Sequence, residues 1–174
     1  MPASTQLPPG YCLQSGSSLD RALLLKFMQR AYTEIIGEGQ FAHLSLTIDS
    51  YLSTETPLWW VELDNPTTED AVNILPGRSL KPIACLWLGV SIDQIHGDRH
   101  ANIFLLYVAP EHRRKGIATA LMQLAEAWAR QRGDRQIALQ VFQVNKTAFE
   151  LYQALGYKTQ SLWMVKPLNQ KKSD

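Results

Sequence analysis

The residues of this sequence best suited to chemistry form a short basic segment around a glycine, Arg113-Arg-Lys-Gly-Ile-Ala118. The segment follows an apolar run of strand length, residues 103–108, and from Gly116 onward apolar residues recur at helical spacing. The first amides of a helix have no intrahelical partners and lie at the positive end of its dipole, and a glycine lets an anion approach them. The segment is therefore a candidate phosphate cradle. The alternative is an ordinary basic surface loop that precedes a helix.

Two motifs resemble signatures of the GNAT superfamily of acetyl-CoA-dependent N-acetyltransferases. Arg113-x-x-Gly116-x-Ala118 is similar to the family's Arg/Gln-x-x-Gly-x-Gly/Ala pattern, and the preceding Val108-Ala109-Pro110 is similar to the Val-x-Pro that ends its central strand. The second motif covers residues 145–157 and follows an apolar run at residues 137–144. The first pattern is only moderately specific, so the resemblance depends on both motifs in this order. It covers residues 83–165.

The resemblance implies acetyl-CoA as the cosubstrate, bound between two splayed parallel strands. The pyrophosphate would bind the amides of the basic loop, and the pantetheine arm would bond to the free edge of the first strand. Asn145 would contact the arm, and Tyr152 would act as the catalytic residue by donating a proton or a hydrogen bond to the departing thiolate. The binding residues that the resemblance implies are Leu106, Tyr107, Val108, Arg113, Arg114, Lys115, Gly116, Ile117, Ala118, Thr119, Asn145, Ala148 and Tyr152. Without it, Asn145 would be a plain helix cap and Tyr152 a half-buried aromatic residue.

A general base is not evident at the position where the resemblance implies one. Many relatives carry a glutamate six residues before the valine of the central strand, and this sequence has Asn102 there. The Asn102 amide cannot accept a proton at neutral pH, and Phe104 cannot either. Glu62, Glu34 and Glu38 are candidates to act through water from other segments. The other possibility is that no dedicated base exists and a small neutral fraction of the amine reacts.

Two further groups of reactive residues are interpreted as structural. Asp93, His96, Asp98 and His100 could ligate a metal, but they fall on a polar turn at the end of the central strand opposite the basic loop. We therefore expect no bound metal. Cys85 lies in an apolar strand without an evident partner to activate its thiol, so we expect direct transfer in a ternary complex and no acetyl-enzyme.

The elements that must position these residues follow from the spacing of apolar residues and from turn residues. A crossover helix makes residues 103–108 and 137–144 parallel neighbours, whereas the earlier strands form an antiparallel meander. This order predicts a mixed α/β (α+β) fold, GNAT-like by resemblance, with one mixed sheet and helices on both faces. We expect helices at residues 17–33, 42–53, 116–132 and 145–155, strands at 11–13, 58–63, 83–92, 103–108, 137–144 and 162–165, and a long loop at 64–81.

Length and composition are typical of one globular domain, which we expect over residues 1–174. The chain has 174 residues, of which 45% are hydrophobic, and a formal net charge of +1, without the basic excess of a nucleic-acid binder. Two cysteines are too few for a disulfide framework, and no signal peptide or membrane-spanning segment is evident. We therefore expect a cytoplasmic monomer or homodimer without membrane partners. Residues 1–16 should be irregular apart from the short strand at 11–13, and residues 169–174 should form a polar tail.

Three functions are weighed on this basis. The first is an N-acetyltransferase acting on a primary amine of a small molecule, a peptide or a protein terminus. The second is a non-catalytic CoA-binding regulatory module, which Asn102 favours and Tyr152 opposes. The third, a nucleotide-binding enzyme, is weakened because neither G-x-x-x-x-G-K-[ST] nor G-x-G-x-x-G occurs in the sequence.

The resemblance implies that the amine acceptor binds to residues 32–43 and 158–162. Three aromatic residues in or beside these segments could line an acceptor pocket or equally pack a core: Tyr32, Phe41 and Trp163. Glu34 and Glu38 could attract a cationic amine, or they could belong to a solvated loop.

Overall fold

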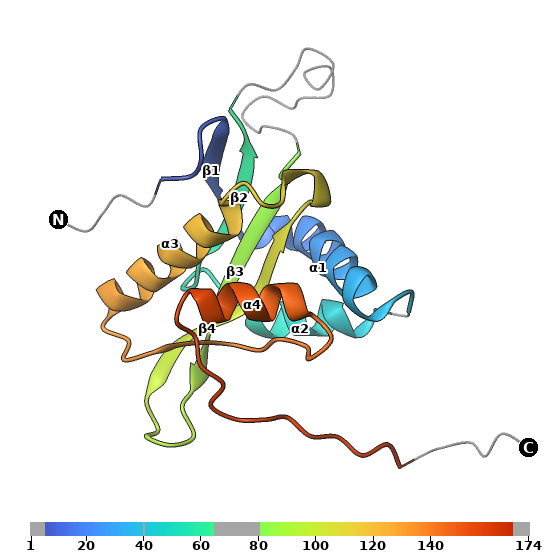
Figure 1. Ribbon diagram of the computed structural model, residues 1–174, viewed down its shortest axis with the longest axis vertical. Coiled ribbons are helices and arrows are strands. Elements are labelled where there is room, and N and C mark those ends of the chain that lie inside the picture. Colours follow the sequence, from blue (N-terminus) through green and yellow to red (C-terminus); the bar gives the residue numbers. More distant parts are fainter. Residues whose placement is uncertain (1–5, 40, 65–80, 169–174) are drawn as a thin grey trace, which may run out of the picture.

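The computed structural model describes residues 6–39, 41–64 and 81–168 (Figure 1). One five-stranded sheet lies at its centre, in which β1 to β4 pair antiparallel in chain order and β4 pairs parallel with β5. The strands are β1 (Tyr11–Ser15), β2 (Leu58–Leu63), β3 (Ala84–Ile92), β4 (Arg99–Val108) and β5 (Ile137–Leu139). The helices are α1 (Arg21–Ile36), α2 (His43–Tyr51), α3 (Ile117–Arg132) and α4 (Lys146–Ala154), with 3-10 turns at Ser18–Asp20 and Pro110–His112. The mixed sheet expected from the sequence is confirmed.

Helices cover both faces of the sheet, and each face has its own core. On one face α1 and α2 pack against β2, β3 and β4, with Phe27 and Trp87 among the buried residues. On the other face α3 and α4 cover the same strands, with Leu121 and Leu86 in the core (Figure 1). Burial on both faces explains why β3 is apolar along most of its length. No helix of the described residues is long and apolar enough to cross a membrane.

A β-bulge in β4 separates the two halves of this central strand. Trp87 of β3 pairs with Leu105, but the next residue of β3 pairs with Ile103, so Phe104 has no opposite residue. The bulge turns Leu105 toward the α1 core, whereas Ile103 faces the α3 core. Gly89 leaves room for Phe104, the extra residue of the bulge, because a β-carbon at Gly89 would lie 2.1 Å from the Phe104 ring. The strand therefore bends just beyond the point where β5 stops pairing with it.

Two strand predictions are wrong in extent or existence. The strand expected at residues 137–144 ends at Leu139, because the ladder with β4 stops before the bulge and the chain then turns toward α4, with the Asn145 amide donating to the Phe142 carbonyl at 2.8 Å. The strand expected at residues 162–165 is not formed in the described structure, since its residues have no ladder partner there. β-propensity is local, but a strand also needs an edge to pair with.

The remaining elements agree with the sequence apart from their ends. Ser17, the first residue of the helix expected at residues 17–33, does cap a helix start, but it opens a 3-10 turn before α1 rather than α1 itself. β4 begins at Arg99, four residues earlier than expected, because the hairpin turn is tight around Gly97 at φ 77°. The expected loop at residues 64–81 lies almost entirely outside the described residues. The expected polar tail at residues 169–174 lies entirely outside them.

Candidate functional site

The basic loop joins β4 to α3 and contains two residues in the left-handed region. Gly116 is the N-cap of α3 with φ 86° and ψ −2°, and Arg114 has φ 61°. Glycine adopts such angles without steric cost, which explains its presence at this turn. Within the described residues no N-cap side chain bonds to the first turn of α3, so its amides remain available to an acceptor. This is the local geometry that a phosphate cradle needs.

Arg113 is directed away from the cradle and toward α1. Its Nε donates to the Val108 carbonyl at 2.8 Å and its guanidinium to the Glu34 carboxylate at 2.5 Å. The second oxygen of Glu34 accepts from the Tyr107 hydroxyl at 2.8 Å, and the guanidinium lies 5.7 Å from the centre of the Tyr107 ring. Burial, followed by the hydrogen bond to Glu34, raises the pKa of Tyr107 to about 12. Because Arg113 is held by Glu34, the exposed Arg114 and Lys115 are the cations left to face the cradle.

Beyond β5, β4 has a free backbone edge. The ladder with β5 ends at Ile103, whereas β4 continues to Val108. In an antiparallel pair, successive residues direct their backbone groups alternately toward the partner and away from it. The Ala109 amide donates to the carbonyl of Ile83, just before β3, at 2.8 Å. The backbone N–H and C=O of Tyr107, two residues earlier, point to the same side. The N–H and C=O of Leu106 therefore face the gap left by β5, where an extended ligand could bond to them.

Asn145 and Tyr152 both lie on α4, in the places that the sequence predicts for them. The Asn145 Oδ1 accepts from the Ala148 amide at 3.2 Å, so Asn145 does cap the helix. Tyr152 is half-buried, packs against the α3 core and has its ring centre 6.0 Å from that of Tyr157. Burial raises the pKa of Tyr152 to about 12. A phenol in this environment is protonated at neutral pH and can donate.

The candidate bases occupy unequal positions. Asn102 lies between β3 and β5 with Gly89 and Ala138 as ladder neighbours, so its strand position contributes no carboxylate. Glu62 is buried at 5% exposure on β2, and its Oε2 has no hydrogen-bond partner in the described structure. Glu34 is engaged by Tyr107 and Arg113. Glu38 is exposed beyond the end of α1. The geometry therefore favours none of them as a free base next to the β4 edge.

The polar side chains of the hairpin turn between β3 and β4 form hydrogen bonds and ion pairs, mostly within the turn itself. The Asp93 carboxylate accepts from the amides of Ile95 and His96 and lies 2.6 Å from the His96 Nδ1. These bonds hold the pKa of Asp93 below its usual value. Asp98 pairs with Arg135 at 2.9 Å. Within the described residues, no group of three His, Cys, Asp or Glu side chains could hold a metal ion.

Cys85 is fully buried between the sheet and α1. Burial raises the pKa of its thiol far above the usual value. A thiol that remains protonated is a poor nucleophile, so this environment does not favour an acetyl-cysteine.

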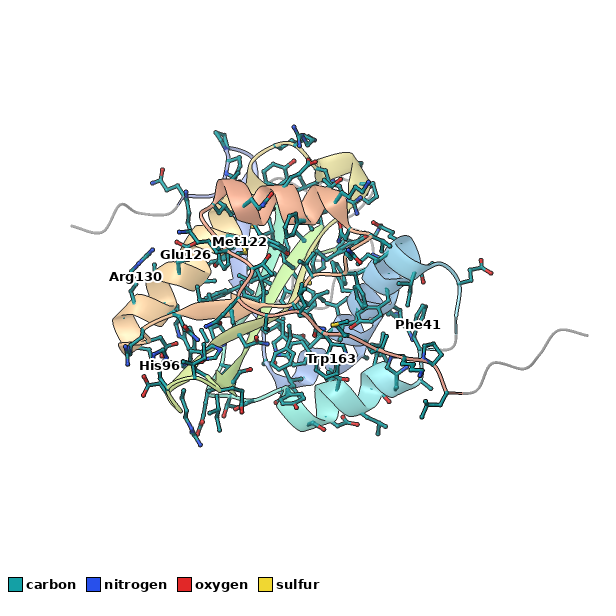
Figure 2. The ribbon with its side chains drawn as sticks, turned by 60° about the horizontal axis from the view of Figure 1, so that its bottom comes forward. Phe41, His96, Met122, Glu126, Arg130 and Trp163 are labelled. Carbon is teal, nitrogen blue, oxygen red and sulfur yellow. The ribbon has the colours of Figure 1, made fainter. Side chains whose placement is uncertain are left out.

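An aromatic cluster lies where the α1–α2 connection meets the segment after β5. The Tyr32 ring centre is 6.0 Å from that of Phe41, 6.5 Å from that of His43 and 5.7 Å from that of Phe142. The sequence predicts Tyr32 and Phe41 as candidates to line an acceptor pocket. It does not predict Phe142, because residues 137–144 are expected to form a strand. Trp163, the third aromatic candidate, lies on the C-terminal segment (Figure 2). Its side chain is 83% exposed.

Comparisons with known proteins agree on one family. The model of the Acetyltransferase (GNAT) family matches residues 31–157. An uncharacterised N-acetyltransferase of Bacillus subtilis is 35% identical over 82 residues, which are 47% of this chain and 52% of that protein. N-acetyltransferase 8 of Homo sapiens is 27% identical over 130 residues, 75% of this chain and 51% of that protein. The chain thus spans about half the length of these curated relatives.

Solved structures share the fold over nearly the whole chain. A protein of Clostridium acetobutylicum, described as a predicted acetyltransferase with acetyl-CoA, has a TM-score of 0.69 at 17% identity and covers 91% of this chain and 96% of its own. An aminoglycoside antibiotic 6'-N-acetyltransferase of Acinetobacter baumannii has a TM-score of 0.61 at 21% identity. The match covers 92% of this chain and 99% of that chain. At these identities the likeness concerns the fold.

Proposed function

Because the chain belongs to the GNAT family of acetyltransferases, we propose that it forms a single domain that transfers an acetyl group from acetyl-CoA to a primary amine. The observation that carries the proposal is the adjacency of two binding elements. The α3 N-terminus at Gly116 follows closely on the β4 edge, where Leu106 directs its backbone groups into the gap. A pyrophosphate suits the first element and an extended, amide-bearing arm suits the second. Coenzyme A carries both groups.

The proposed reaction is a direct transfer. The amine nitrogen attacks the thioester carbonyl, the C–N bond forms, and the C–S bond breaks to release a thiolate. A backbone amide at the β4 edge, such as that of Leu106, would stabilise the negative charge that develops on the carbonyl oxygen. Tyr152 would give its proton to the thiolate, and its raised pKa of about 12 keeps that proton in place at neutral pH.

The proton that the amine loses is proposed to leave through water. Asn102 cannot accept it, and Glu34 already accepts hydrogen bonds from Tyr107 and Arg113. The reactive species is then the neutral fraction of the amine, which grows tenfold with each pH unit below the amine's own pKa. We expect kcat/KM to rise with pH at this slope and to level off at the pKa of the acceptor.

The acceptor is proposed to bind on the aromatic cluster beside α1. Tyr32, Phe41 and Phe142 offer ring surfaces there. Glu34 lies near the end of α1, and Glu38 follows just beyond it. Ring surfaces and carboxylates suit a cationic amine on a compact scaffold. Aminoglycosides belong in the test panel, because an aminoglycoside N(6')-acetyltransferase of Acinetobacter genomosp. 13 is 35% identical over 78 residues.

The test is calorimetry with acetyl-CoA and with ATP, followed by assays of thiol release across amines. The panel should contain aminoglycosides, polyamines, and peptides with free N-termini. We expect saturable binding of acetyl-CoA, weaker binding of ATP, and release of thiol with at least one amine. Binding without thiol release on any amine would favour the non-catalytic CoA-binding module, and failure to bind acetyl-CoA would overturn both readings.

A further inference from the structure

The residues that lead into β1 lie against the start of α3. Residues 6–10, here called the N-terminal arm, precede β1, and Figure 1 shows β1 and α3 on the same side of the molecule. Leu7 packs against the α3 core. The Pro8 Cγ would lie 3.6 Å, an ordinary contact distance, from a β-carbon at Gly116. The arm, from the other end of the sequence, therefore reaches the glycine of the proposed cradle.

The sequence of the arm makes it stiff. Pro8 and Pro9 each fix their own φ, and each restricts the residue before it to extended backbone. Gly10 then turns the chain at φ 87°, and its carbonyl accepts from the Asp64 amide at 3.1 Å, just after β2. A segment with few accessible conformations loses little entropy when it packs against another element. The arm is therefore suited to holding a neighbouring loop in place.

A side-chain hydrogen bond joins the first residue of β1 to the basic loop. The Tyr11 hydroxyl lies 2.9 Å from the His112 Nδ1, and the two rings meet edge to face with their centres 5.7 Å apart. His112 ends the 3-10 turn Pro110–His112, one residue before Arg113. Both side chains are half-buried, so water competes less for this bond than at an exposed site. Tyr11 thus contacts the loop from 101 positions away in the sequence.

The loop is held from both faces of the sheet. Tyr11 packs on the α3 face, whereas Glu34 lies on α1 and holds Arg113. Backbone amides bind an anion well only when they already converge on it, so the residues that fix their loop contribute to binding without touching the ligand. This requirement is strict here, because Arg114 and Gly116 both adopt left-handed backbone angles.

We propose that Pro8, Tyr11 and His112 are positioning residues, which hold residues 112–116 in the arrangement that binds the pyrophosphate of acetyl-CoA. This inference rests on the proposed function. The arm then takes part in binding the donor and not in the chemistry at the thioester, which lies at the other end of coenzyme A. Loss of the hold should therefore raise the KM for acetyl-CoA and leave kcat unchanged at saturating acetyl-CoA.

Calorimetry with acetyl-CoA and steady-state assays of the full chain test the hydrogen bond. Tyr11→Phe removes only the hydroxyl and His112→Leu removes its partner, and each should weaken acetyl-CoA binding by roughly three- to tenfold, the usual worth of one hydrogen bond. The double variant should lose no more than either single variant, because both changes remove the same bond. His112→Asn should keep the affinity, since its amide has a donor and an acceptor as many bonds from the backbone as Nδ1.

Two matched controls follow from the structure. Tyr51→Phe removes a hydroxyl from α2, where the ring packs on Phe104 instead of on the loop. Pro8→Ala and Pro9→Ala each remove one ring from the arm, but Pro8 lies against Gly116 whereas Pro9 is exposed. Only Pro8→Ala should weaken acetyl-CoA binding. Unchanged affinity in Tyr11→Phe, or equal losses in His112→Asn and His112→Leu, would overturn the proposal.

Amide hydrogen exchange of the ligand-free chain separates this proposal from the proposed function. Tyr11→Phe should speed exchange at residues 113–118, compared with the unmodified chain and with Tyr51→Phe. Faster exchange in a chain that does not bind acetyl-CoA would refute the proposed function and support the hold on the loop. Unchanged exchange in a chain that binds acetyl-CoA normally would overturn the positioning role and leave the proposed function standing.

Discussion

At the scale of single residues, the burial of Tyr152 restricts its proposed role to that of a proton or hydrogen-bond donor. Burial raises its pKa to about 12, so the phenol keeps its proton through the pH range in which acceptor amines become neutral. A group that titrates only above that range can donate throughout it. The pH dependence of the reaction should therefore follow the amine, with no loss of activity from Tyr152 until the pH approaches about 12.

Tyr152→Phe should lower kcat by about 10²-fold or more, the usual worth of general acid catalysis, while acetyl-CoA affinity changes little because the ring still packs. Steady-state rates and calorimetry on the same preparation measure both quantities. Tyr157→Phe is the control, since it removes a second phenol whose ring centre lies 6.0 Å from that of Tyr152. Equal kcat in Tyr152→Phe and the unmodified protein would reduce Tyr152 to a packing residue.

Gly116→Val should weaken acetyl-CoA binding by at least tenfold, because a branched side chain would stand at the start of the cradle. Gly133 provides a matched control: it has the same φ of 86° at the other end of α3. A left-handed conformation costs an L-residue about 1–2 kcal/mol, so both valine variants should lose similar stability to urea. Only Gly116→Val should lose affinity in calorimetry. Equal affinity in the two variants would place the pyrophosphate elsewhere.

At the scale of elements, the bulge in β4 explains how the sheet opens. Phe104 lies flat against Trp87, with ring centres 4.9 Å apart, and it occupies the space that a side chain at position 89 would need. The ladder with β5 ends one residue earlier, at Ile103. Gly89 thus leaves room for the bulge, and the free edge of β4 at Leu106 begins just beyond it.

Gly89→Ala should destabilise the fold by about 1–3 kcal/mol, the usual cost of overpacking, because its β-carbon would lie 2.1 Å from the Phe104 ring. Urea unfolding of three proteins tests the cause: Gly89→Ala, Phe104→Ala and the double variant. If the clash is responsible, the double variant will be more stable than the sum of the single changes predicts. Additive losses would mean that Gly89 acts through the backbone instead.

Sequence patterns predicted these elements unevenly, for physical reasons. Helix ends at Gly116 and Gly133 were predictable because a left-handed turn needs a glycine, and both adopt one. The lengths of β5 and of the last strand were not, because a ladder depends on a distant partner. The bulge at Phe104 and the contact between Glu34 and Arg113, 79 positions apart, leave no periodic signal in either segment.

At the scale of the whole molecule, Glu34 joins the two layers of the fold. It lies on α1, on one face of the sheet, and holds Arg113 of the loop that leads into α3, on the other. The two side chains are 37% and 43% exposed, so solvent screens the pair and its contribution to stability is at most about 1 kcal/mol. Its importance would lie in holding the loop in place.

Glu34→Gln should therefore leave thermal stability nearly unchanged but weaken acetyl-CoA binding several-fold, because Arg113 loses its ionic partner. Asp49→Asn is the control: Asp49 of α2 pairs with Arg21 at the start of α1 at 2.5 Å, with similar exposure of 50% and 44%, away from the loop. Calorimetry should show a change only for Glu34→Gln. Loss of affinity in both variants would point to a general effect on α1.

The Glu34–Arg113 contact has a thermodynamic consequence for how the binding of acetyl-CoA and the binding of the acceptor affect each other. If donor binding shifts the loop, it shifts the end of α1 where the proposed acceptor surface begins, and the two ligands then change each other's affinity by one common factor. Coenzyme A without its acetyl group would occupy the same loop, so its affinity and that of the acetylated product would also be coupled, by a factor of their own. Release of the two products would be linked in the same way, so that the departure of one alters the residence time of the other.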